Sequence, residues 1–312
     1  MKTALIFTGG TIGSKIQKDG FIAPVGGGKH DILSGYNIED FDISEPYTIL
    51  SENLDDKRIM SLLKCIAENL KNHNGVIVCH GTDTLQYSAA AAAYAFGNDT
   101  VPIVFVSSNY VLSDDRANGR DNFRAAVDFI KNSRGRGTFI SYKNAGEATK
   151  IHRAARVLPY APYSDYIASI GGEYGRHEND KFVKNADYIE IPDEAEPFGV
   201  TDLTKAKVLK ISAYPNMEIN TEADAGTSCA AVLLETYHSG TVAETAVDTD
   251  KKIFILGVED RTQYASVKAY DRPNVTVLRK AAAPAMYMKL KTAIAAGRLG
   301  DMNKALGGDY IK

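Results

Sequence analysis

The sequence predicts an α/β protein of two domains, the first larger than the second. Its 312 residues exceed one average domain and suit two. Short β-rich runs alternate with helical patterns through the first half, which is typical of βαβ units and a largely parallel sheet. Residues 190–205 then combine two prolines, a glycine and several acids, as an interdomain linker does. We therefore expect domains at residues 1–189 and 206–312.

The first half supplies four predicted strands and three predicted helices. The strands are short apolar runs at residues 3–8, 75–80, 101–107 and 137–142. In residues 55–72 and 119–132, apolar side chains recur on one face at helical spacing, which predicts amphipathic helices. Residues 84–97 are rich in alanine and predict a third helix. This order favours a Rossmann-like N-terminal domain.

After the linker the same alternation resumes on a smaller scale. Strands are expected near residues 207–213, 229–235, 253–258 and 274–278. A final helix is expected at about residues 283–296. These elements predict a smaller C-terminal α/β domain.

Composition favours small-molecule chemistry in the cytoplasm. A formal net charge of −3 supplies no electrostatic footprint for nucleic acid or for an anionic membrane surface. No apolar run approaches the roughly 18 residues of a membrane span, and the N-terminus lacks the pattern of a signal peptide. The three cysteines are an odd number and widely spaced, so they are interpreted as reduced thiols.

Two polar clusters directly follow predicted strands, where open α/β sheets place their ligand sites. The first is TGGTIG at residues 8–13, whose glycines allow a tight turn that presents the Thr11 hydroxyl. It lacks the glycine spacing of a dinucleotide-binding loop, so a nucleotide cofactor is not expected. The alternative is a simple strand-ending turn.

The second cluster is HGTDT at residues 80–84, which pairs the Thr82 hydroxyl with the Asp83 carboxylate. Asp83 has the charge to hold a substrate ammonium, and Thr82 can hold a water or a carbonyl. The alternative is helix capping, because threonine and aspartate are both good N-cap residues.

Together the two clusters resemble the paired signatures of the bacterial-type L-asparaginase/glutaminase family, which are threonine-nucleophile amidohydrolases. Weaker similarities lie at residues 50–53 (LSEN), 116–122 (RANGRDN) and 284–290 (PAMYMKL). The resemblance covers residues 3–180 well and the second domain poorly. It implies the family's two-domain architecture, hydrolysis of the side-chain amide of L-asparagine or a related amide, and a homodimer or homotetramer. It implies no metal and no organic cofactor.

Carried over by position, the resemblance makes Thr11 the nucleophile that forms an acyl-enzyme, with Thr82 and Asp83 opposite it. It makes Ser51, Glu52 and Asp83 the residues that bind the α-carboxylate and α-ammonium groups of the substrate.

Two catalytic positions depart from the family pattern. Phe21 stands where the family has a loop tyrosine ten residues after the nucleophile, and a phenyl ring cannot relay a proton. The family's lysine aligns near residues 158–159, where this chain has leucine and proline. Lys150 and Arg156 are the candidates to replace it, and Lys150 is preferred because arginine does not release its proton. The alternative is that both are solvated surface cations on a hairpin.

These departures leave a second hypothesis open. The protein could be a catalytically weakened or inactive relative that binds an amino acid or amide. A third hypothesis, a peptide or transfer-RNA-linked amide as substrate, is disfavoured for large RNA by the near-neutral to acidic composition.

Overall fold

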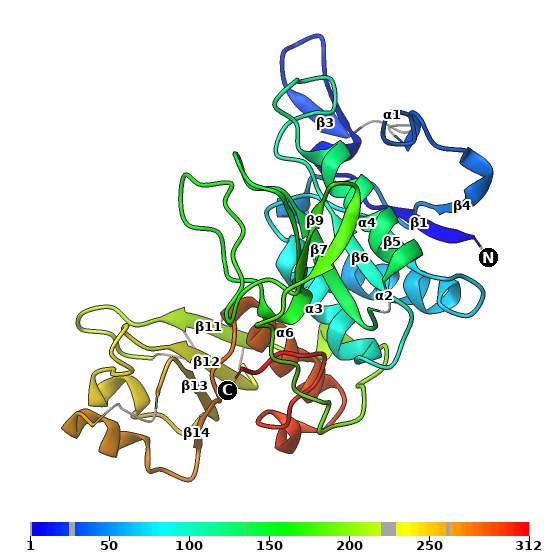
Figure 1. Cartoon of the computed structure of the whole chain (residues 1–312). Helices are drawn as coiled ribbons and strands as arrows, with labels where there is room; N and C mark the ends of the chain where they lie inside the picture. Colours follow the sequence, from blue (N-terminus) through cyan, green and yellow to red (C-terminus); the bar gives the residue numbers. More distant parts are fainter. Residues whose placement is uncertain (1, 25–28, 134, 220–228, 260–262, 312) are drawn as a thin grey trace.

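The structure is a computed structural model, and it describes residues 2–24, 29–133, 135–219, 229–259 and 263–311. Within these ranges no helix has both the length and the apolar character that crossing a membrane requires. The architecture is mixed α/β, with a large eight-stranded sheet, a small four-stranded sheet and a two-stranded hairpin (Figure 1).

The large sheet has eight strands in the order β10-β9-β8-β7-β6-β5-β1-β4. Their bounds are β1 (Thr3–Phe7), β4 (Phe41–Ser44), β5 (Val76–Cys79), β6 (Ile103–Val106), β7 (Thr138–Tyr142), β8 (Thr149–Arg153), β9 (Gly175–Glu178) and β10 (Lys181–Lys184). Strands β4, β1, β5, β6 and β7 pair in parallel, as predicted, and β8 to β10 pair antiparallel. The four strands predicted for this half are confirmed as β1, β5, β6 and β7.

Helices cover both faces of this sheet because successive strand residues point to opposite sides. Leu5 and Ile77 pack with Phe123 of α4 (Gly119–Asn132) on one face. Ile6 and Val78 pack on the other face with α2 (Asp56–Asn69) and α3 (Leu85–Phe96). The three predicted helices are thus confirmed within a few residues.

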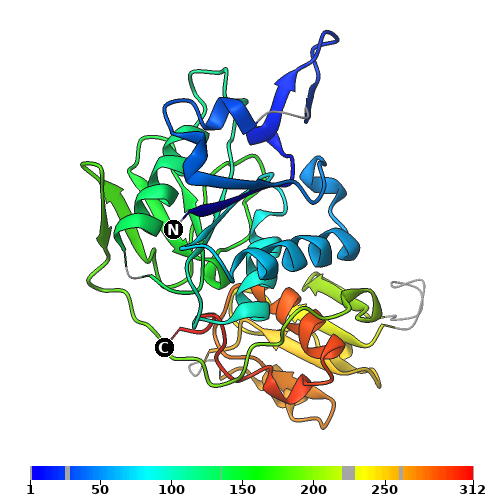
Figure 2. The same ribbon diagram turned by 90° about the vertical axis from the view of Figure 1, so that its right-hand side faces the viewer.

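The small sheet is fully parallel, in the order β11-β12-β13-β14. Its strands are β11 (Val208–Ser212), β12 (Ala231–Glu235), β13 (Ile253–Leu256) and β14 (Val275–Val277), and each matches a predicted strand. The final helix, α6 (Ala283–Ala295), is also confirmed. Figure 2 shows the small sheet and α6 below the large sheet.

Helix α6 shares one apolar core with α3 and with the facing side of the small sheet. Met286 and Leu290 lie in the same buried cluster as Leu233 and Phe254. Residues 190–205 connect the two sheets, and Phe198 donates its N–H to the Tyr94 carbonyl in α3. The sheets are therefore joined through packed side chains along α3 and α6.

A short hairpin, β2 (Ser14–Ile16) with β3 (Ile22–Pro24), extends away from the large sheet (Figure 1). A short helix, α1 (Lys29–Ile32), follows it. Phe21 precedes β3, and 74% of its surface is exposed. The structure thus holds Phe21 on a projecting segment, largely in solvent.

Candidate active site

The two signature turns meet backbone to backbone at the carboxyl ends of β1 and β5. These strands are parallel neighbours, so the turns that follow them leave the sheet at the same edge. A Cβ atom on Gly10 would lie 2.3 Å from the Gly81 Cα atom. Gly10 also has a φ of 72°, which side chains disfavour. This contact therefore requires glycine. Thr11 directly follows Gly10 and Thr82 directly follows Gly81, so each threonine lies one residue beyond the contact.

A third segment, around Ser51, closes the crevice. The Gly10 N–H donates to the Ile49 carbonyl at 2.9 Å. A Cβ atom on Gly81 would lie 2.4 Å from the Ser51 Oγ atom. The Thr84 hydroxyl donates to the Ser51 carbonyl at 2.9 Å. The segments that carry Thr11, Ser51 and residues 82–83 are therefore in direct contact.

Asp83 is exposed, and its carboxylate accepts a long hydrogen bond of 3.4 Å from the Ser51 hydroxyl. The alternative role of Asp83 as a helix cap is wrong. The N-cap residue of α3 is Thr84, and no side chain caps that helix end. Glu52 follows Ser51 in a short 3-10 helix, Ser51–Asn53, and is also exposed. The carboxylates of Asp83 and Glu52 are thus accessible to a ligand.

We expect Asp83→Asn to weaken the binding of α-amino amides by about tenfold to a hundredfold. The change would remove the charge-assisted hydrogen bond that Asp83 is expected to make with a substrate ammonium, worth about 1.5–3 kcal/mol. The free energy of unfolding should change little, because the carboxylate is exposed and caps no helix. Calorimetry with L-Asn checks this result, and Asp271→Asn, an exposed carboxylate of the small-sheet half, is the control. Unchanged affinity in Asp83→Asn would remove Asp83 from the site.

His80 positions the second turn, a role that sequence reasoning missed. It is buried, and burial lowers its pKa to about 4, so its ring is neutral at physiological pH. Its Nδ1 atom lies 2.9 Å from the Gly81 carbonyl, and its Nε2 atom lies 2.9 Å from the Ser88 hydroxyl. A neutral ring meets both partners if Nδ1 donates and Nε2 accepts. The ring therefore ties the turn to α3.

His80 makes stability depend on pH. Because its folded pKa of about 4 lies below the ordinary value of 6.5, the unfolded chain binds more protons between these values. Stability is expected to fall as pH drops from 6.5 towards 4, by about 1 kcal/mol per pH unit from this group. Urea unfolding across that interval measures the slope. His80→Gln should lower the slope by that amount, and an unchanged slope would contradict this assignment.

Lys150 and Arg156, the two candidates for the family's lysine, lie in different environments. Lys150 is opposite Tyr142 in the β7–β8 pairing, at the same sheet edge as the two turns. Its Nζ atom lies 2.6 Å from Glu147. Burial alone would lower the pKa of Lys150, but its hydrogen bond and charge interaction with Glu147 raise it above the ordinary value. The structure therefore favours a protonated Lys150, three strands away from β5.

Arg156 lies at the other edge of the sheet and is 1% exposed, so the surface-cation interpretation is wrong for it. Its guanidinium donates to three backbone carbonyls, those of Gly308, Ile189 and Tyr310. This arrangement fixes the C-terminal segment against the large sheet. Arg156 is therefore a structural residue, remote from the two turns.

Tyr160 is a second residue that the sequence did not single out. Its hydroxyl is buried and has no hydrogen-bond partner among the described residues. Burial raises the pKa of Tyr160, and the neighbouring Tyr142, Asp165 and Asp83 raise it further. Tyr160 therefore supplies a neutral phenol near Asp83.

The fold is α/β, and the polar candidate site lies at the carboxyl ends of the parallel strands β1 and β5. The family model described as "Asparaginase, N-terminal" matches residues 2–162. The chain therefore belongs to the asparaginase family.

Known relatives agree with this assignment. The chain is 41% identical over 131 residues to a glutamyl-tRNA(Gln) amidotransferase component of Methanosarcina acetivorans, covering 40% of the chain and 30% of that protein. It is 29% identical over 136 residues to L-asparaginase of Thermococcus kodakarensis, covering 42% of the chain and 41% of that protein. The chain thus spans less than half the length of these curated relatives.

Solved structures show the fold over nearly the whole chain. The thermostable L-asparaginase from Thermococcus kodakarensis superposes with a TM-score of 0.83 at 18% identity, covering 100% of both chains. A probable cytoplasmic L-asparaginase from Campylobacter jejuni gives 0.72 at 20% identity, covering 95% of this chain and 94% of that one. The predicted asparaginase-like architecture is confirmed.

Proposed function

We propose that this protein hydrolyses the side-chain amide of L-asparagine, or of a related small amide, through an acyl-enzyme on Thr11. The contact between Gly10 and Gly81 carries the proposal, because it joins the turn of Thr11 to the turn of Thr82 and Asp83. Thr11 follows Gly10 at the start of a short 3-10 helix, Thr11–Gly13, and is half-buried. A hydroxyl in such a loop is free to approach a bound carboxamide.

In the proposed reaction the Thr11 Oγ atom attacks the carboxamide carbon, and its proton leaves with the ammonia. The resulting ester is cleaved by water, which regenerates the Thr11 hydroxyl. Backbone N–H groups of the two turns would stabilise the oxyanion. Asp83, Ser51 and Glu52 would bind the α-ammonium and α-carboxylate end of the substrate. Lys150, held protonated by Glu147, would supply a proton or a positive charge rather than act as a base.

Trapping with hydroxylamine tests the covalent step. An acyl ester on Thr11 can be attacked by hydroxylamine as well as by water, so L-Asn should yield aspartyl hydroxamate together with ammonia. The hydroxamate should form in proportion to the hydroxylamine concentration. Ammonia release without hydroxamate would indicate direct attack by water and would contradict the acyl-enzyme.

A second candidate function rests on Phe21 and on the protonated Lys150. Both weaken proton transfer from Thr11, which favours an inactive relative that still binds an amino acid or amide. Some relatives are named as components of a glutamyl-tRNA(Gln) amidotransferase, so L-glutamine is included among the amides to be assayed. We propose a homodimer or homotetramer for either function, on family resemblance.

We expect Phe21→Tyr to raise kcat/KM on the best amide, because it restores a phenol on the segment that follows Thr11. The gain should not exceed about 10²-fold, the lower end of general acid–base contributions. Phe21 is exposed, so the added hydroxyl should not destabilise the free enzyme. A fall in kcat/KM would instead indicate that Phe21 packs over an apolar part of the substrate, where a hydroxyl lacks a partner.

A further inference from the structure

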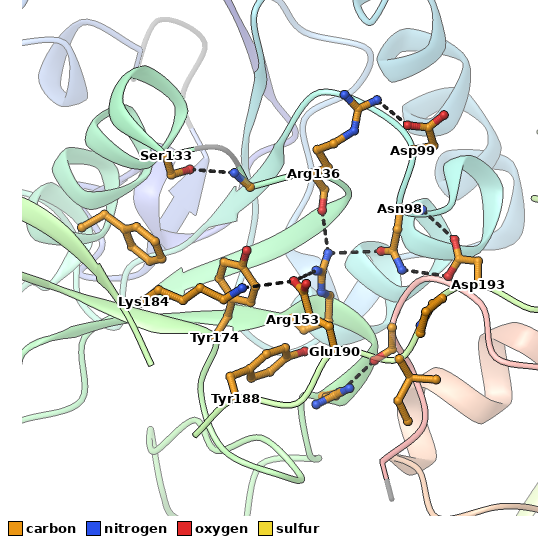
Figure 3. Close-up of a pocket in the computed structure, with 16 residues that line it drawn as sticks. Asn98, Asp99, Ser133, Arg136, Arg153, Tyr174, Lys184, Tyr188, Glu190 and Asp193 are labelled. Carbon is orange, nitrogen blue, oxygen red and sulfur yellow. Dashed lines mark hydrogen bonds and ion pairs between the residues drawn. The ribbon is translucent and has the colours of Figure 1, made fainter. Parts of the chain in front are cut away.

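A cavity of about 760 Å³ lies at the edge of the large sheet opposite the candidate active site. Asn98 and Asp99 precede β6, Arg136 precedes β7, and Arg153 ends the antiparallel β8, so these lining residues share the amino-end edge. The two signature turns follow the carboxyl ends. The volume falls in the usual range for small-molecule sites. Figure 3 shows Lys184, Arg153 and Glu190 directed toward one another in this cavity.

Two buried donors in the cavity lack an acceptor. Arg153 is 4% exposed, and its Nε atom has no hydrogen-bond partner in the described part of the chain. Tyr188 is 8% exposed, and its hydroxyl is likewise unpartnered there. Arginine can only donate, and a buried donor without an acceptor is costly. The missing partner is therefore a hydrogen-bond acceptor.

Positive charge exceeds negative charge around these donors. Four cations line the cavity, Arg136, Arg153, Arg156 and Lys184, against three acids, Asp99, Glu190 and Asp193. Of these three acids, Glu190 is the one that faces both Arg153 and Lys184, at the long distances of 3.5 Å and 3.7 Å.

The other two acids are engaged elsewhere. Asp193 accepts from the side chain and N–H of Asn98 and from the Gly307 N–H, and Asp99 pairs with Arg136. The half-exposed carboxylate of Glu190 is thus shared between Arg153 and Lys184 at the centre of the cavity.

The aromatic rings keep these cations in place. The Arg153 guanidinium lies 4.3 Å from the centroid of Phe139, and the Lys184 Nζ atom lies 5.0 Å from that of Tyr174. Tyr188 packs edge-on against Tyr174, with centroids 5.1 Å apart. Such contacts preorganise the cationic groups without using their hydrogen-bonding capacity.

We propose that this cavity binds a small organic anion, whose oxyanion accepts hydrogen bonds from Arg153 Nε and the Tyr188 hydroxyl and pairs with Lys184. A carboxylate and a phosphate ester share this chemistry. A neutral ligand would leave the excess charge unmatched, and a cation would be repelled. The site is separate from the proposed amidohydrolase site, so either can exist without the other.

Calorimetric titration of the full chain at constant ionic strength tests the proposal, with sodium succinate and sodium phosphate as probes. At least one probe should bind with a Kd of about 1 mM or tighter, and the tighter one identifies carboxylate or phosphate as the ligand class. Failure of both probes to bind would overturn the proposal.

Three variants locate the binding. Tyr188→Phe keeps the ring and removes only a hydroxyl that has no partner among the described residues. This variant should therefore fold normally and weaken binding of the probe about threefold to tenfold. Lys184→Met should weaken binding of the probe about tenfold. The matched control is Lys181→Met, which changes an exposed lysine of the same strand outside the cavity and should leave binding of the probe unchanged. Binding that Asp83→Asn weakens and Tyr188→Phe leaves unchanged would place the probe in the candidate active site and overturn the proposal.

Discussion

Replacing Thr11 with alanine is expected to abolish amide hydrolysis and to leave the fold intact. The change removes the proposed nucleophile, and losses of this kind reach roughly 10³-fold or more in kcat. Thr11 is half-buried at the start of a short 3-10 helix, so the free energy of unfolding should change by less than about 1 kcal/mol. Thr11→Ser keeps a hydroxyl and should retain part of the rate.

Ammonia release and a urea unfolding curve on the same preparation check both halves of this expectation. An alanine variant that releases ammonia at the parental rate would contradict covalent catalysis by Thr11. Mass spectrometry of the trapped adduct would then identify the residue that carries the acyl group.

Lys150→Met and Arg156→Met are expected to have opposite phenotypes. Loss of Lys150 should lower kcat by about 10²-fold or more, as for a positioned acid–base group, with little effect on stability. Loss of Arg156 leaves the buried carbonyls of Gly308 and Tyr310 and the part-buried carbonyl of Ile189 without their donor, which should lower stability by roughly 3 kcal/mol or more. In the fraction that stays folded, kcat should be near that of the parent protein.

Kinetics and urea unfolding on both variants separate the two roles. Parental turnover in Lys150→Met, with loss of turnover in a stably folded Arg156→Met, would reverse the assignment.

Strands β1, β5, β6 and β7 could be predicted because they are buried at every residue and consist largely of apolar side chains. The strands β8 to β10 were missed for the opposite reason. The β8 sequence TKIHR is mostly polar, yet His152 and Arg153 are buried there. Their partners, the Ser169 hydroxyl and the Asn98 side chain, come from distant segments. A single-sequence pattern cannot show that a polar side chain will find a distant partner.

The candidate site likewise contains residues that the sequence predicted and residues that it did not. The crevice of Thr11, Ser51 and Asp83 was predicted through a resemblance between two short glycine-containing motifs, and glycine is what the close approach of their backbones requires. His80 and Tyr160 were not predicted to take part. The partner of His80, Ser88, lies one turn into α3, so a histidine that directly follows a strand and a serine eight residues later form a detectable signal. The surroundings of Tyr160 depend on tertiary packing and leave no such signal.

The most direct test of the proposed function is ammonia release by the purified protein with L-Asn, D-Asn, L-Gln and small N-acyl amides, each at millimolar concentration. We predict turnover of L-Asn or a related amide, with ammonia and the carboxylate product formed in equal amounts, and loss of both in Thr11→Ala. Absence of turnover on every amide, while L-Asp or L-Asn raises the melting temperature, would contradict the hydrolase and support the binding protein.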